Sequence, residues 1–271
     1  MVNTKSASIS PLDRPIHREL PLQPLRALRN VVLLGGTVWL SGLRAAIGRS
    51  VLDLPVTDEL TVLEIWRQRL AELAGAIDRT SLPVRVVMAH GAPMPTAPAS
   101  PASTARASIA PASTASASTA RSSVAPASAA PALMSPVPMT PELSVAARAE
   151  LLLERDVMAF RGTGGVLRDL TTDEAPGACI LVANAAQLLF EPLAPLVTQL
   201  AHADADVSFV AHYDGTPCRL MLIRCRALRV LPRVGFVDLM EQGLPLIAAD
   251  HHVVALHRAH AASLPVRTLG G

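Results

Sequence analysis

Aromatic and charged residues are both scarce in this sequence, at 3% and 17% of its 271 residues. A core with few aromatic side chains has to be built from Leu, Val and Ile, and runs of such residues are typical of strands buried in a parallel sheet. The acidic and basic residues nearly balance, with a net charge of +2. Because they form no dense Lys/Arg cluster, nucleic acid is not an expected partner.

Cysteines and long apolar runs are also rare. The three cysteines, Cys179, Cys218 and Cys225, include no Cys-x-x-Cys pair, and their odd number leaves at least one outside any disulfide. The N-terminal residues are interrupted by prolines and contain no apolar signal core, and no later stretch approaches about 18 uninterrupted apolar residues. We therefore expect neither export nor a membrane span, and we expect a cytoplasmic location.

Several catalytic motifs are missing as well. The sequence has no P-loop, no Gly-x-Gly-x-x-Gly after its first apolar run and no Gly-x-Ser-x-Gly nucleophile motif. Four histidines lie close together near the C-terminus, but an expected strand separates them into two pairs: His251, His252, His257 and His260. Neighbouring residues on a strand point to opposite faces. We interpret these histidines as surface or packing residues, with a zinc site as the alternative.

Two segments differ in composition from the rest of the chain. Residues 1–29 contain prolines at short intervals and no sustained periodicity, so we expect an extended N-terminal arm. Residues 92–141 are mostly Ala, Pro, Ser and Thr, with few large side chains to offset the entropy of ordering the chain. We expect this tract to be a disordered insertion within one domain that spans residues 30–271.

Apolar patterning predicts strands that alternate with helices outside those two segments. Residues 61–77 have apolar side chains at helical spacing. Helices are also predicted near 188–203, with the regular part after Pro195, and near 240–248. Short aliphatic runs predict strands at 31–34, 84–88, 179–184, 207–211, 219–223 and 253–256. The alternation predicts an α/β fold with an open, mostly parallel, Rossmann-like sheet.

Three segments carry a resemblance to a known family. Residues 31–56 read as a strand, a Gly-Gly loop, a basic residue and a closing Leu-Pro-Val, and residues 162–167 read Gly-Thr-Gly-Gly-Val-Leu. Residues 180–189 begin with an apolar run, predicted as a strand, that ends at Asn184. In this order, they resemble the sugar-phosphate nucleotidylyltransferases, also called nucleotide-sugar pyrophosphorylases. The resemblance implies a sheet of the nucleotide-diphospho-sugar transferase type.

The resemblance also implies a set of site residues. It assigns nucleotide binding to two glycine-rich turns: Gly35, Gly36 and Thr37 around the phosphates, and Gly162, Thr163, Gly164 and Gly165 beside the base and sugar. Glycine suits such turns because a backbone without Cβ can approach phosphate oxygens closely. The catalytic cation of the family aligns best with Arg49.

The sequence departs from the family at two functional positions. The loop segment 38–40, where the family has a basic residue, reads Val-Trp-Leu and offers no cation. The position of the metal-binding aspartate is Ala186, which cannot ligate a hard cation. Asp238 is the best remaining candidate for a metal contact. Its alternative role is to cap the helix predicted near 240–248.

Two functions follow as expectations. The first is a nucleotidyltransferase with impaired catalysis, which would transfer a nucleotidyl group from a nucleoside triphosphate to a sugar 1-phosphate and release pyrophosphate, with magnesium if it is active. The second is a catalytically silent regulatory module that binds a nucleotide or nucleotide sugar. The substitutions at 38–40 and at Ala186 motivate the second expectation.

Overall fold

The protein was analysed as a computed structural model that describes residues 23–35, 48–96, 147–156, 158 and 160–266. Contacts divide the chain into two units, residues 1–95 with 147–271 and residues 96–146. The predicted extended arm at 1–29 is too long, because Gln23–Ala27 form a 3₁₀ turn and Leu28 begins the first strand. The rest of the arm and most of the predicted insertion at 92–141 lie outside the described residues, so the disorder of the insertion stays a prediction.

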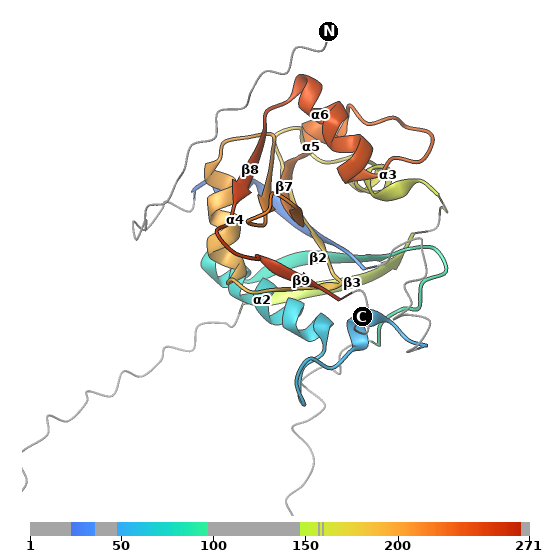
Figure 1. Ribbon diagram of the computed structural model, residues 1–271, viewed down its shortest axis with the longest axis vertical. Helices are drawn as coiled ribbons and strands as arrows, with labels where there is room; N and C mark the ends of the chain where they lie inside the picture. The colour runs from blue at the N-terminus through green and yellow to red at the C-terminus, as the bar shows by residue number, and fades with distance from the viewer. Residues whose placement is uncertain (1–22, 36–47, 97–146, 157, 159, 267–271) are drawn as a thin grey trace, which may run out of the picture. The chain divides into compact units, whose positions relative to one another are not determined.

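A seven-stranded sheet forms the centre of the first unit (Figure 1). Its strands lie in the order β3-β2-β1-β4-β7-β6-β8. Their bounds are β1 Leu28–Leu34, β2 Ser81–Met88, β3 Arg148–Arg155, β4 Cys179–Asn184, β6 Val207–Ala211, β7 Pro217–Arg224 and β8 Val253–His257. A separate two-stranded sheet pairs β5 (Gln187–Leu189) with β9 (Ser263–Pro265).

Most neighbouring strands run parallel. Strand β1 pairs in parallel with β2 on one side and with β4 on the other, and β2–β3 and β6–β8 are also parallel pairs. Only β7 runs against its neighbours β4 and β6. The predicted α/β fold with a mostly parallel sheet is therefore confirmed.

Helices pack on both faces of the sheet (Figure 1). Helices α2 (Val62–Ala76) and α4 (Leu193–His202) bury their apolar sides in one core. On the other face, α3 (Gly162–Leu170), α5 (Cys225–Leu228) and α6 (Leu244–Asp250) share a second core with the π-helical turn η4 (Leu239–Gly243). Two 3₁₀ turns, η1 (Gln23–Ala27) and η2 (Val51–Asp53), complete the elements.

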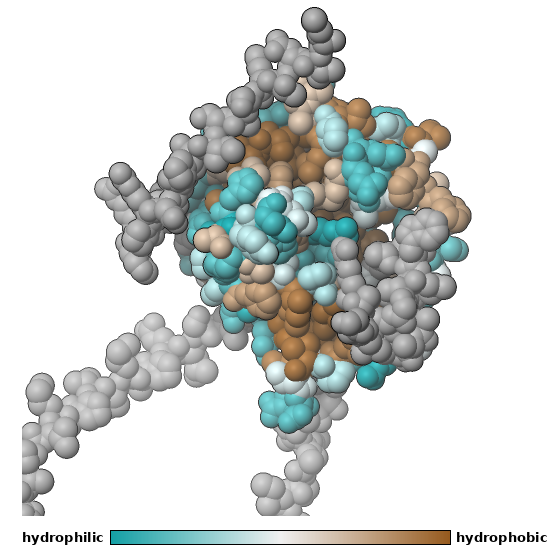
Figure 2. All heavy atoms as spheres, in the orientation of Figure 1, coloured by the Kyte–Doolittle hydropathy of each residue, from teal (hydrophilic) through white to brown (hydrophobic). Residues whose placement is uncertain are grey.

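The cores are aliphatic, as the composition predicts. Leu, Val and Ile from the central strands are almost completely buried, and Trp66 on α2 is the main aromatic contribution, at 2% exposure. Its indole N–H donates to Ala185 O at 2.9 Å, which ties α2 to the end of β4. With few charged residues available, the surface also exposes apolar side chains. The face in Figure 2 shows hydrophobic areas separated by hydrophilic residues.

Helix α2 begins with a reciprocal cap. The Thr61 hydroxyl accepts from the Glu64 N–H at 3.3 Å, and the Glu64 carboxylate accepts from the Thr61 N–H at 3.4 Å. This capping box satisfies two backbone donors that a helix start leaves without intrahelical partners. The predicted helix at 61–77 is confirmed, and its first residue is set by this cap.

Two predicted boundaries were wrong. The helix predicted to start after Pro195 begins at Leu193, with Pro192 as its N-cap residue. Proline is tolerated in a first helical turn because the N–H it lacks has no intrahelical acceptor there. The residues before that helix, Gln187–Leu189, form strand β5 instead of helix, because they pair with β9.

Asp206 links three segments at the start of β6. Its Oδ1 accepts from Arg226 Nε at 2.6 Å, and its Oδ2 lies 3.2 Å from His251 Nδ1 and 3.3 Å from the His252 N–H. Burial alone would raise the pKa of Asp206, but the hydrogen bonds from Arg226, His251 and His252 and the charge of Arg226 lower this pKa below its usual value. The ionised carboxylate therefore holds the start of β8 against β6.

We predict that Asp206 contributes to acid sensitivity. A carboxyl whose pKa is lower in the folded state stabilises the fold above its unfolded-state pKa of about 3.9, and this stabilisation is lost as the pH falls through the folded-state value. Asp206→Asn should lower the free energy of unfolding at pH 7 by about 1–3 kcal/mol. Urea unfolding across the pH range should show the variant and the unaltered protein converging at low pH. A difference that stays constant with pH would contradict this role.

The connection from β2 to β3 has a minimum length. Ala92 still lies at the carboxyl end of β3, since its carbonyl accepts from Arg155 Nη2 at 3.2 Å. Strand β3, which has 8 residues, runs parallel to β2, so the chain must return about 26 Å to the amino end of the strand. Parallel neighbours need a crossover of about a dozen residues or more.

We therefore predict a length-dependent outcome when residues 93–147, which join Ala92 to the first residue of β3, are replaced. A Gly/Ser connector of about 15 residues should leave a cooperatively unfolding protein, because it can span the strand. A connector of about 4 residues reaches at most about 14 Å and should prevent β3 from pairing. Circular dichroism during urea unfolding measures whether each of the two variants unfolds cooperatively. Cooperative folding of each half expressed alone would show instead that the tract joins independent domains.

Candidate functional site

The carboxyl ends of β1 and β4 meet at the point where the chain order of the sheet reverses. The Ala185 N–H donates to Leu34 O at 3.0 Å, which joins the segments that follow these two strands. Strand β1 has β2 on its other side, so the connections leave β1 and β4 in opposite directions. In open α/β sheets, this switch point is where ligands bind.

Gly35 lies at this switch point and is packed closely. Its N–H donates to Val87 O at 2.9 Å. A Cβ at position 35 would lie 2.4 Å from Met88 Sδ and 3.2 Å from Leu52 Cδ1, so the position requires glycine unless Met88 moves. Gly36 and Thr37 lie outside the described residues, as does the Val-Trp-Leu segment. Arg49 is exposed and precedes η2, whose Leu52 packs beside Gly35.

The glycine turn at the start of α3 lies at the same edge of the sheet. The Asp156 N–H, directly after β3, donates to Met88 O at 2.7 Å, and the Asp156 carboxylate pairs with Arg161 at 2.8 Å. Arg161 immediately precedes Gly162. A chain of contacts therefore runs from Gly35 through Met88, Asp156 and Arg161 to α3, and the sequence-predicted segments converge on one edge.

This turn is packed against the segment before η4. Gly162 has φ +71°, and a Cβ there would lie 2.3 Å from Val237 O. The Gly164 N–H donates to the same carbonyl at 2.9 Å, and the Val237 N–H donates to Arg161 O at 3.1 Å. Close backbone approach thus explains the glycines at 162 and 164, and part of the donor capacity of the helix start is already used.

Asp238 caps the helical turn η4. Its Oδ1 accepts from the N–H groups of Met240 at 2.8 Å and Glu241 at 3.0 Å. Its Oδ2 accepts from the Thr163 hydroxyl at 3.4 Å, and that hydroxyl accepts from the Leu239 N–H at 2.9 Å. The capping role expected from the sequence is confirmed, and Thr163 joins the cap to the start of α3.

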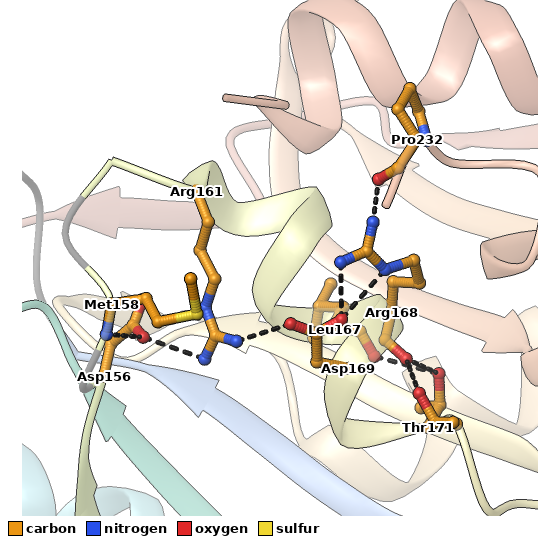
Figure 3. A network of polar contacts seen from close by, with 9 residues as sticks. Asp156, Met158, Arg161, Leu167, Arg168, Asp169, Thr171 and Pro232 are labelled. Carbon is orange, nitrogen blue, oxygen red and sulfur yellow. Dashed lines mark hydrogen bonds and ion pairs between the residues drawn. The ribbon is translucent and has the colours of Figure 1, made fainter. Parts of the chain in front are cut away.

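An ion-pair network that the sequence did not predict lies beside this turn (Figure 3). Arg161 lies between Asp156, at 2.8 Å, and Asp169, at 2.6 Å. Arg168 pairs with Asp169 and donates to Pro232 O. The Arg161 side chain is only 17% exposed, and its Nε is buried without a hydrogen-bond partner. These guanidinium groups are therefore already neutralised by carboxylates.

Magnesium requires several oxygen ligands at one point, and the described residues do not supply them here. Both oxygens of Asp238 accept hydrogen bonds, and Asp156 and Asp169 face arginine. The Asn184 Oδ1 accepts from the Ala186 N–H at 2.9 Å. Within the described ranges, no three His, Cys, Asp or Glu side chains come close enough to hold a metal ion. The donors at this edge do not fit the metal that the family resemblance implies.

Two of the four C-terminal histidines lie beside separate carboxylates. His251 lies beside Asp206, and His260 Nε2 lies 3.3 Å from Glu191 Oε1. Glu191 also pairs with Arg258, which follows β8. These contacts match the interpretation of the histidines as surface and packing residues.

The three cysteines are buried and unpaired. Burial raises the pKa of Cys179 and Cys218, and it raises the pKa of Cys225 to about 11. Thiols of this kind stay protonated at neutral pH and are poor nucleophiles. Among the described residues, no helix is both long and apolar enough to cross a membrane.

Comparison with known proteins gives matches in structure only. No family model and no curated protein matches the chain. Among solved structures, HddC from Yersinia pseudotuberculosis complexed with GMP-PN has 11% identity and a TM-score of 0.48, over 89% of this chain and 95% of that one. A candidate glucose-1-phosphate thymidylyltransferase from Bacillus anthracis in complex with sucrose has 9% identity and a TM-score of 0.47, over 84% and 86%.

A third solved structure is Rv0371c from Mycobacterium tuberculosis H37Rv. It has 16% identity and a TM-score of 0.45, over 89% of this chain and 93% of that one. The same protein is also known in complex with manganese. These likenesses concern the overall fold, and at such scores they carry no argument about what this chain binds.

Substitution of Gly162 tests the close packing of the α3 turn. We predict that Gly162→Ala lowers the free energy of unfolding by at least about 1–3 kcal/mol, because it combines a positive φ with a clash against Val237 O. Gly177→Ala is the matched control, since a Cβ there meets nothing within 4 Å. Urea denaturation compares the two variants. Equal stabilities would show that the turn can move away from Val237.

Proposed function

We propose that this chain is a nucleotidyltransferase-like protein that binds a nucleotide or a nucleotide sugar at the carboxyl edge of its sheet. The observation that carries the proposal is the convergence of the family-like segments on one edge. Gly35 and Ala185 meet at the switch point, and contacts through Met88 and Asp156 connect them to the α3 turn. These segments are far apart in the sequence, so their meeting is a property of the fold.

The chemistry of the edge supports a phosphate-bearing ligand. Gly35 directly follows a buried parallel strand, a position at which backbone N–H groups can reach phosphate oxygens. Arg49 is exposed next to η2, and its guanidinium can bind a phosphate through two N–H groups. In this proposal, Gly36 and Thr37 complete the loop, and the turn from Gly162 to Gly165 borders the base and the sugar.

The same residues favour binding over catalysis. Attack of a sugar phosphate on the α-phosphorus of a nucleoside triphosphate needs stabilisation of the charge that passes to pyrophosphate. Ala186 offers no ligand for a metal, and Asp238 is engaged as a helix cap. We therefore place a binding module ahead of an active transferase. Transfer with magnesium is the second candidate, motivated by the ordered resemblance of the three segments.

We predict measurable binding that depends on Arg49. Calorimetry with nucleoside triphosphates and nucleotide sugars should detect at least one ligand. Arg49→Ala should weaken its binding roughly tenfold or more, because a charged hydrogen bond to phosphate is lost. Arg29→Ala is the matched control: Arg29 is also exposed, but it lies at the amino end of β1, at the opposite edge. The Arg29→Ala variant should bind the same ligand as tightly as the unaltered protein does.

Pyrophosphate release with sugar phosphates separates the two candidates. If a nucleotide or nucleotide sugar binds but pyrophosphate release stays at the level of Arg49→Ala, the result supports the binding module. Release that requires both substrates and a divalent metal would establish a transferase instead. If none of these ligands binds at millimolar concentration, both nucleotide functions are wrong.

A further inference from the structure

A cavity of about 450 Å³ opens at the amino edge of the sheet, opposite the proposed nucleotide site. It lies where β1 and β4 begin, since Leu28 pairs with Cys179, and where β7 ends, since Cys179 pairs with Arg224. The last turn of α4 and the segment that follows it form the rest of the wall, including His202 and Asp204. The cavity volume falls within the range of about 300–1,000 Å³ typical of small-molecule sites.

Small and aliphatic side chains line most of this cavity. Ala27, Ala201 and Ala205 leave the space open, and Leu200 and Leu222 supply apolar surface. Cys179 adds a thiol whose pKa is raised by burial, so it acts as a small apolar group. A ligand for this cavity therefore needs an apolar body of modest size.

Two polar side chains favour a negatively charged ligand group in this cavity, and the first is Arg224. The Arg224 side chain is 30% exposed, and its Nη2 donates to Asp204 Oδ1 at 2.8 Å. The Asp204 side chain is 90% exposed, so this carboxylate can turn into water at little cost when another anion binds the guanidinium. A guanidinium can hold an incoming carboxylate through two parallel N–H groups.

His202 is the second polar group. Its Nε2 is buried without a hydrogen-bond partner, although the residue lines the cavity. An unpaired buried ring nitrogen is unfavourable, and a polar ligand atom that the ring can turn toward would remove this cost. The C-terminus of α4 carries the negative end of the helix dipole, which opposes any anion and opposes a ligand with two negative charges, such as a phosphate, more than one with a single charge. A single negative charge fits better.

We propose that this cavity is a separate binding site for a small organic monocarboxylate with a short branched apolar tail. Arg224 holds the carboxylate, His202 hydrogen-bonds to it, and the tail lies against the alanine and leucine side chains. This site is independent of the proposed nucleotide function, because its residues lie at the other edge of the sheet.

The test uses three probes that separate the effect of the charged group from that of the apolar tail. 4-Methylpentanoate presents a carboxylate on a branched tail, 3-methylbutylamine presents an ammonium on a similar tail, and inorganic phosphate lacks the tail. Titrations followed by two-dimensional NMR of the full chain should show millimolar binding of 4-methylpentanoate, as expected for a ligand of this size. The amine and phosphate should bind much more weakly.

Variants locate the binding. Arg224→Met should weaken the binding of 4-methylpentanoate roughly tenfold or more, because a charged hydrogen-bonding group is removed. Ala205→Leu, which fills the cavity without changing charge, should weaken it as well. Arg229→Met is the control: Arg229 is exposed and donates to Glu174 O, outside the cavity. Nucleotide binding should be unchanged in Arg224→Met.

The proposal is overturned if 4-methylpentanoate fails to bind. It is also overturned if either Arg224→Met or Ala205→Leu binds this probe as the unaltered protein does, or if the amine binds equally well. Loss of nucleotide binding alone, with carboxylate binding retained, would contradict only the nucleotide function.

Discussion

The parallel pairing of β1 with β4 is the interaction on which the rest of the structure depends. Residues Leu28–Leu34 pair with Cys179–Asn184, although about half of the chain lies between them. Closing so long a loop costs entropy, but the cost rises only slowly with length. Cys179–Ala183 of β4 and Val31–Leu33 of β1 are buried, and their apolar contacts on both faces offset that cost. Their pairing creates both the switch point at one edge and the cavity at the other.

The α3 turn shows how the candidate site combines packing with function. Its glycines permit contact with Val237, its threonine bonds to the η4 cap, and its neighbouring arginines pair with Asp156 and Asp169. Groups satisfied in this way are preorganised, since each holds another in place. They are also less available to a ligand. In our proposal, the exposed Arg49 therefore carries the charge recognition.

Much of the fold follows from local patterns in the sequence. The aliphatic runs at 179–184 and 207–211 became β4 and β6 with the predicted bounds, and helix α2 lies within its predicted range. The capping box of α2 was present as Thr61-Val62-Leu63-Glu64 and would have given its first residue. Strand β3 was harder to predict, because its Arg148–Arg155 sequence has charged ends and lies at the edge of the sheet. The Arg161 network depends on residues brought together by tertiary packing, and no sequence spacing indicates it.

Glycine-rich motifs indicate a fold more directly than they indicate an activity. A glycine that approaches a phosphate and a glycine that approaches another backbone segment meet the same physical demand, which is the absence of Cβ. At positions 35 and 162, the closest neighbours are Met88 and Val237 of the chain itself. At position 162, where the neighbour is backbone and φ is positive, packing alone is sufficient to explain glycine; at position 35 the neighbour is the Met88 side chain, which can shift. A side chain such as an aspartate ligand has no comparable packing role at the end of β4, where Ala186 stands. A domain that retained its fold after losing catalysis would keep the first kind of residue and lose the second, and this is the reasoning behind the binding module that we propose.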